Sequence, residues 1–188
     1  MDTLPLGPKP IVRASAKAPI LIAGQAPGTK AHASGLPFDD LSGDRLRDWL
    51  GVDRNLFYDT RYFSFVPMGF CYPGRMEQGR GDAPPDPRCQ HTWHDRLIPT
   101  LKARQLTIVM GRYALDYHLG GKIRKTESLV SIVQRYQAFL PEFLPLPHPS
   151  PRNLMWFRKN PWFEADVIPA LRARVQSLLG QLDCYQKS

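Results

Sequence analysis

Residues 18–28 read APILIAGQAPG, a short apolar run that ends in a loop containing glycine and proline. Because the run is β-branched, short and closed by glycine, it predicts a buried strand. Three more such runs follow, RYFSFVPM at 61–68, LTIVMG at 106–111 and EFLPLPH at 142–148. The prolines of the last run limit it to an edge position or a strand end.

Segments with helical spacing of apolar residues fill the gaps between these runs. DDLSGDRLRDWLG at 39–51 predicts a helix with Ser42 as its N-cap and Gly51 as its stop. Further helices are predicted at 89–104, where Pro99 would kink or split the helix, at 112–121, at 128–140, and at 160–182 with Pro161 in first position. Alternating strands and helices predict a three-layer α/β/α sandwich with a four-stranded, mainly parallel sheet.

Length and composition predict one domain over residues 1–188. The chain has 188 residues and is 43% hydrophobic, which is enough for one sizeable core. Residues 1–17 form a Pro-rich lead, and residues 71–89 form a Pro/Gly/Arg-rich loop without a core-forming pattern. No apolar run approaches a membrane span, and the start lacks a signal-peptide layout. Three cysteines argue against a disulfide framework and for a reducing compartment, so we expect a cytoplasmic protein. We also expect a monomer.

The charge points to a polyanionic partner. Lysine and arginine number 25 against 17 acidic residues, a formal net charge of +8. Nucleic acid is the commonest partner of so basic a surface. The alternative is a basic protein without such a partner.

Two unusual loops follow the first and fourth predicted strands, at the edge where parallel sheets place ligands. In GQAPG at 24–28, Gln25 brings an amide donor and acceptor, but the loop lacks the phosphate-loop lysine and the dinucleotide glycine spacing. HPSPRN at 148–153 would present His148 and Arg152 on a stiff loop. Taken alone, each loop is also compatible with an ordinary turn.

A third stretch, GLPFDD at 35–40, lies between the first two predicted strands. Its Phe38 either plugs the core or offers a flat face to a planar ligand. Adjacent carboxylates such as Asp39 and Asp40 are usually solvated or cap a helix.

Together the three motifs resemble the uracil-DNA glycosylase superfamily, over a span from about Leu4 to Arg174. GQAPG and GLPF are similar to the thermophilic-type, iron–sulfur branch. HPSPRN with KNPWFE downstream is similar to the single-strand-selective monofunctional branch. The resemblance implies that superfamily's fold and a monofunctional DNA glycosylase of base excision repair. Its partner would be DNA that contains deaminated bases, with the target base flipped out of the helix.

The resemblance also implies roles for single residues. Phe38 matches the aromatic residue that stacks on the flipped base, and His148 matches the donor to the pyrimidine O2 as negative charge builds on the leaving base. Arg152 matches the residue that fills the gap in the duplex, with Ser150 and Asn153 on the same DNA-facing loop. The loop that positions water and approaches base and sugar matches Gly24, Gln25, Ala26, Pro27 and Gly28.

Three departures from the family pattern stand out. Ala26 replaces an aspartate and Gln25 a glutamate, so Gln25 would only orient the water. Asp39 or Asp40 could serve as the base, but the sequence does not show which of them does, if either. Pro67 stands where an asparagine reads the uracil edge, so uracil is the first expectation and hypoxanthine and xanthine stay open.

The third departure concerns an iron–sulfur cluster. Cys71 and Cys89 match two of its four ligand positions, and the other two ligands are absent. Either the start of the chain has been trimmed or the cluster has been lost. We expect no cofactor requirement for catalysis and no metal, unless the missing ligands are supplied.

Two other interpretations remain at this point. One is a nucleic-acid-binding member of the superfamily with weak or no glycosylase activity, which the changes at Ala26 and Pro67 motivate. The other is an α/β protein that binds nucleotides or nucleosides and has no role on DNA. The basic charge and Arg152 count against the second.

Overall fold

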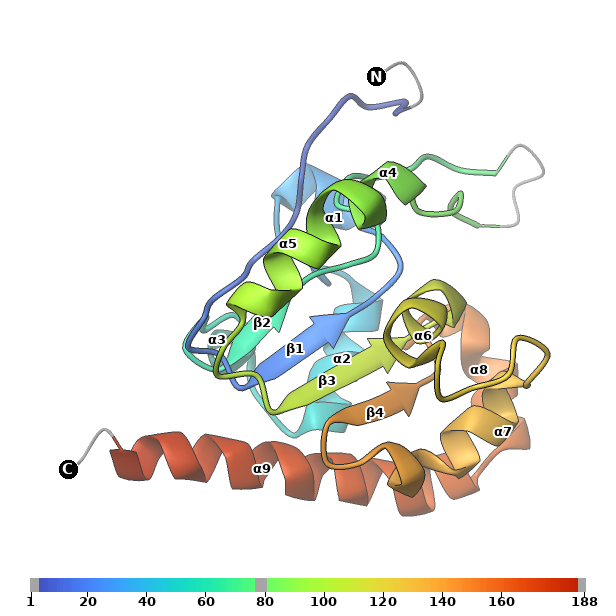
Figure 1. Cartoon of the computed structure of the whole chain (residues 1–188). Helices are drawn as coiled ribbons and strands as arrows, with labels where there is room; N and C mark the ends of the chain where they lie inside the picture. Colours follow the sequence, from blue (N-terminus) through green and yellow to red (C-terminus); the bar gives the residue numbers. More distant parts are fainter. Residues whose placement is uncertain (1–3, 77–80, 186–188) are drawn as a thin grey trace.

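The computed structural model describes residues 4–76 and 81–185. Its centre is a four-stranded parallel sheet in the order β2-β1-β3-β4 (Figure 1). The strands are β1 (Ile20–Ala23), β2 (Phe63–Phe65), β3 (Leu106–Met110) and β4 (Phe143–Leu146). All four predicted strands are therefore confirmed, and the proline-bearing β4 lies at an edge, as predicted.

Helices cover both faces of the sheet, which confirms the predicted α/β/α layering. On one face, β1 residues such as Ile20 and Ile22 pack on Trp49 of α2 and Leu171 of α9. On the other, Ala23 packs on Leu115 of α6, and Leu21 packs on Leu101, which follows η2. Successive residues of one strand thus face opposite layers, as the strand repeat requires.

The helices on the α9 face are α2 (Leu41–Leu50), α3 (Arg54–Phe57), α8 (Leu154–Lys159), the π-helical turn η5 (Phe163–Val167) and α9 (Ile168–Tyr185). The opposite face carries α5 (Asp95–Leu97) with the 3₁₀ turn η2 (Ile98–Thr100), and α6 (Arg112–Leu119). The remaining turns are α1 (Thr29–Ser34), α4 (Pro87–Cys89), the π-helical η1 (Gln90–His94), α7 (Leu129–Gln134), and the 3₁₀ turns η3 (Tyr136–Phe139) and η4 (Pro151–Asn153).

The predicted cap of α2 is wrong by two residues. Asp40, not Ser42, is the N-cap, because its extended backbone lets the carboxylate accept a hydrogen bond from the Gly43 amide. Ser42 is buried in the first helical turn. Gly51 ends the helix in the left-handed region, as predicted.

Several helices differ in extent from the prediction. The 89–104 segment is a series of short pieces from Pro87 to Thr100, which ends in the 3₁₀ turn that contains Pro99. The segment at 160–182 begins as the π-helical turn η5 before α9. Helix α8 was not predicted, because the prolines of HPSPRN masked the helical pattern that follows them.

The Pro-rich lead runs along the free edge of β2. Arg13 and Phe65 exchange two backbone hydrogen bonds, and the Ile11 amide donates to the Phe70 carbonyl. This pairing covers an edge that would otherwise expose unpaired backbone groups. Among the described residues, no helix combines the length and apolar character needed to cross a bilayer.

Candidate active site

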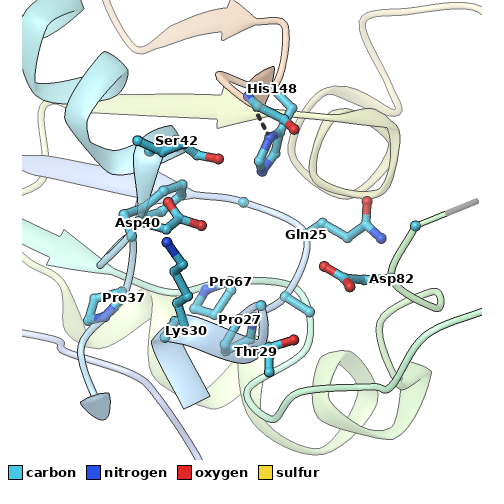
Figure 2. Close-up of a pocket in the computed structure, with 18 of the residues that line it drawn as sticks. Gln25, Pro27, Thr29, Lys30, Pro37, Asp40, Ser42, Pro67, Asp82 and His148 are labelled. Atoms are coloured by element: carbon cyan, nitrogen blue, oxygen red, sulfur yellow. Dashed lines mark hydrogen bonds between the residues drawn. The ribbon is translucent and has the colours of Figure 1, made fainter. Parts of the chain in front are cut away.

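A pocket of about 590 Å³ opens at the carboxyl ends of the strands. Its walls come from the loop after β1, the segment after β2 and the loop after β4, together with residues 37–42 (Figure 2). Strand β1 lies between β2 and β3 in the sheet. The connections that follow β1 and β2 therefore run to opposite sides of β1, which makes this edge a switch point of the topology. Open parallel sheets place ligands at such a switch point.

The loop after β1 is fixed by the segment after β2. The Met68 amide donates to the Gly24 carbonyl at 2.9 Å, and the Gly69 amide donates to the Gln25 carbonyl at 2.8 Å. These bonds continue the parallel pairing of β1 and β2 beyond the strands, and they bring buried Pro67 into the pocket wall. The His94 Nε2 atom lies 3.1 Å from the Pro67 carbonyl oxygen, so the only polar group of that residue faces away from a ligand.

Phe38 is held in an uncommon backbone conformation. Its φ is 56°, a left-handed value that non-glycine residues rarely adopt. The Phe38 carbonyl packs so closely on Gly43 that a Cβ there would lie 1.7 Å from the oxygen. Arg47, buried in α2, donates to the same carbonyl at 3.5 Å. These contacts fix the Phe38 backbone, and the ring itself packs against Phe57 and Phe65.

His148 faces this ring from the loop after β4. The two ring centroids are 6.4 Å apart, with 29° between their planes. The Ser150 amide donates to His148 Nδ1 at 3.2 Å, so the proton of the neutral ring is on Nε2. Desolvation of the ring lowers the pKa of His148, although the charges of Asp40 and Asp82 act in the opposite direction. A neutral imidazole therefore presents an N–H to the pocket.

Residues 147–153, which we call the late loop, are tied down by side chains. Asn153 Nδ2 donates to the His148 carbonyl at 2.8 Å, and Arg45 of α2 donates to the Pro149 carbonyl at 3.0 Å. The Ser150 hydroxyl accepts from the Arg152 amide. Asn153 therefore holds the loop together, and its predicted contact with DNA stays a prediction.

The structure separates the two adjacent carboxylates. Asp40 lines the pocket while it caps α2. Asp39 is not among the lining residues, and its ion pair with Arg54 at 2.8 Å holds the pKa of the carboxyl below its usual range. The other predicted residues of the β1 loop and the late loop lie together around the pocket: Gly24, Gln25, Ala26, Pro27, Gly28, His148, Ser150, Arg152 and Asn153.

Sequence reasoning missed several lining residues, above all Arg75 and Asp82. They belong to a short hairpin formed by residues 74–76 and 81–83, which we call the pocket hairpin. The Met76 amide donates to the Gly81 carbonyl, and the Ala83 amide donates to the Gly74 carbonyl. The glycine- and proline-rich composition of residues 71–89 gave no signal for this pairing.

The chain matches the family model of the uracil DNA glycosylase superfamily over residues 12–172. It belongs to this superfamily. The match covers the sheet, the pocket and the late loop, so it confirms the predicted family and fold. Membership supports a DNA-glycosylase type of function and DNA as the substrate.

The two cysteines that match iron–sulfur ligands lie near each other. Both are partly buried, and the Phe70 amide lies 3.4 Å from Cys89 Sγ. Burial raises the pKa of the Cys71 thiol. Within residues 4–76 and 81–182, no group of three or more Cys, His, Asp or Glu is placed to hold a metal ion. These residues do not fit a four-cysteine cluster, and the mechanism below uses none.

Proposed function

We propose that this protein is a monofunctional DNA glycosylase that hydrolyses the N-glycosidic bond of a deaminated base in DNA. Uracil is the first candidate, and hypoxanthine and xanthine are the alternatives. The observation that carries the proposal is the position of His148, whose only free N–H faces a pocket floored by Phe38.

The ring of Phe38 would stack on the flipped base. An aromatic face in a pocket is a sequence-tolerant platform for any base, typically contributing about 1–3 kcal/mol. Gly43 and Arg47 hold the Phe38 backbone in the position from which the ring lines the pocket.

His148 would stabilise the leaving base. Cleavage leaves negative charge on the ring oxygen, and a donor already aimed at that atom lowers the barrier. The lowered pKa supports this role, because a neutral imidazole keeps the Nε2 proton for donation without losing it to the base.

The pocket is expected to discriminate less between nucleobases than it would with an asparagine at position 67. Pro67 offers no side-chain hydrogen bond, and its carbonyl is engaged by His94. A site that does not hydrogen-bond one edge of its ligand discriminates poorly against analogues. We therefore propose that more than one deaminated base is accepted.

Base release from defined DNA tests the function. Labelled duplex and single-stranded oligonucleotides with one uracil, hypoxanthine or xanthine are incubated with the protein, and abasic sites are then cleaved by alkali. We expect strand cleavage from at least one of the three bases and none from an undamaged control. Tight DNA binding without release from any substrate would contradict the proposal and favour a DNA-binding member without activity.

A further inference from the structure

The pocket hairpin brings a carboxylate to the site from a loop without a recognisable motif. Arg75 and Asp82 pair across the hairpin as an isolated antiparallel bridge. Both side chains line the pocket. Figure 2 shows the Asp82 carboxylate beside Gln25, on the side of the pocket away from Asp40.

Asp82 lies against the GQAPG loop itself. A Cβ at Gly28 would be 3.6 Å from Asp82 Oδ2, and Gln25 Nε2 donates to the carbonyl of the adjacent Ala83 at 3.4 Å. The carboxylate therefore occupies the space beside Gln25 and Gly28, in a loop whose positions 25 and 26 offer only an amide and a methyl group.

Asp82 also differs from the other nearby carboxylates in having no partner. Within the described parts of the chain, its side chain makes no hydrogen bond and no ion pair. Asp39 is paired with Arg54, and Asp40 accepts the Gly43 amide. Gln25 cannot take a proton at neutral pH. Of these groups, only Asp82 has both carboxylate oxygens available to a water molecule.

We propose that Asp82 is the general base of the reaction, an inference that rests on the proposed glycosylase function. A water molecule held between Asp82 and Gln25 attacks C1′ of the deoxyribose. The C1′–N bond breaks, and its electron pair leaves with the base, which His148 stabilises by donation from Nε2. The proton of the water passes to the Asp82 carboxylate and then to solvent. The negative charge also stabilises the positive charge that develops on the sugar.

Single-turnover base release by Asp82→Asn tests this assignment. The substitution keeps the shape and removes the base, so we expect the rate to fall about 10²–10⁴-fold, the usual contribution of a positioned base. Duplex binding should stay within a few-fold of wild type. Asp53→Asn is the matched control, because Asp53 caps α3 outside the pocket and asparagine caps a helix equally well.

Two further variants separate chemistry from structure. Asp82→Ala should regain part of its rate in the presence of formate, a small carboxylate that fits the vacated space, whereas a merely structural role would give no rescue. Asp40→Asn keeps the α2 cap and should lose less activity than Asp82→Asn.

The outcomes of these experiments are distinct. Suppose that the wild type releases a base. If Asp82→Asn then keeps a rate within about threefold of wild type, or if formate does not restore the rate of Asp82→Ala, the role of Asp82 is overturned and the proposed function is not. A larger loss in Asp40→Asn than in Asp82→Asn would also overturn the role of Asp82. Wild type that releases no base from any substrate would overturn the proposed function itself.

Discussion

The late loop and the pocket hairpin form neighbouring walls of one pocket, and they are built in opposite ways. The late loop has prolines at 147, 149 and 151, and side chains of Arg45 and Asn153 bond its carbonyls. Among its described residues, the pocket hairpin is held by the Met76–Gly81 and Ala83–Gly74 backbone hydrogen bonds and by the 3.4 Å contact from Gln25. The firmly held wall carries the donor, and the lightly held wall carries the free carboxylate.

The difference fits the chemistry proposed for each wall. A hydrogen bond that stabilises developing charge depends on distances fixed before the reaction. A base that acts through a water molecule tolerates more movement, because the water adjusts its position. The two walls approach each other closely at Gly81, where a Cβ would lie 2.7 Å from Arg152 Nη1.

Within the late loop, the largest effect is expected from His148→Ala. Removal of one preorganised donor typically costs a factor of about 10²–10³ in rate. Single-turnover base release measures the change, while duplex binding should alter little. The control is His91→Ala, which removes an exposed imidazole outside the pocket. If His148→Ala still releases the base at the wild-type rate, His148 is not the donor. The late loop would then carry no catalytic group to set against the carboxylate of the pocket hairpin.

Gly81→Ala tests the contact between the two walls. Gly81 has a φ of 126°, which alanine rarely adopts, and the new methyl group would displace the Arg152 guanidinium. We expect a loss of about 1–3 kcal/mol in the free energy of unfolding, the usual range for such backbone strain. Thermal or urea denaturation measures it.

Gly180→Ala is the matched control for Gly81→Ala. Gly180 lies in α9 with open space around it, so alanine should be neutral or stabilising there. Equal stability of the Gly81 and Gly180 variants would show that the hairpin adjusts freely and that the walls are not coupled.

Arg152→Ala is expected to have a smaller effect that depends on the substrate. Arg152 is exposed on η4 beside the pocket, where a side chain can enter the gap that a flipped base leaves. We expect about a tenfold lower rate on duplex, roughly 1.4 kcal/mol, and little change on single strands. Arg158→Ala, on α8 outside the pocket, is the control. Equal losses on both substrates would contradict the gap-filling role.

The contrast between the walls also explains what the sequence could predict. The four strands were recognisable because buried strands need continuous apolar residues, and the late loop because proline restricts φ wherever it occurs. The pocket hairpin has neither signal, so nothing in residues 71–89 distinguished Asp82 from a solvated aspartate. Asp39 pairs with Arg54, whereas Asp40 caps α2 and lines the pocket. The residues next to Asp39 and Asp40 in the sequence do not reveal these different contacts.

Acid titration gives the smallest effect and compares the walls directly. Desolvation lowers the pKa of His148, and Arg152 acts in the same direction, while Asp40 and Asp82 oppose it. As the pH falls below about 6.5, the unfolded chain therefore takes up this proton before the folded protein does. The contribution of the neutral ring to the free energy of unfolding is therefore highest above that pH. It falls progressively as the pH is lowered from there to the pKa that His148 has in the folded protein. Protonation at Nδ1 also removes the acceptor of the Ser150 amide.

Two-dimensional NMR of the imidazole and of the backbone amides follows this change. We expect His148 to titrate below 6.5, and the Ser150 amide to exchange faster as it does. The Met76 and Ala83 amides of the pocket hairpin should keep their partners, because carbonyl acceptors do not titrate. Asp82→Asn should lower the His148 pKa further, since it removes a charge that favours the imidazolium. A His148 pKa above 6.5 would mean that the carboxylates outweigh desolvation, and the late loop would then carry a cation at the pH where the neutral donor is needed.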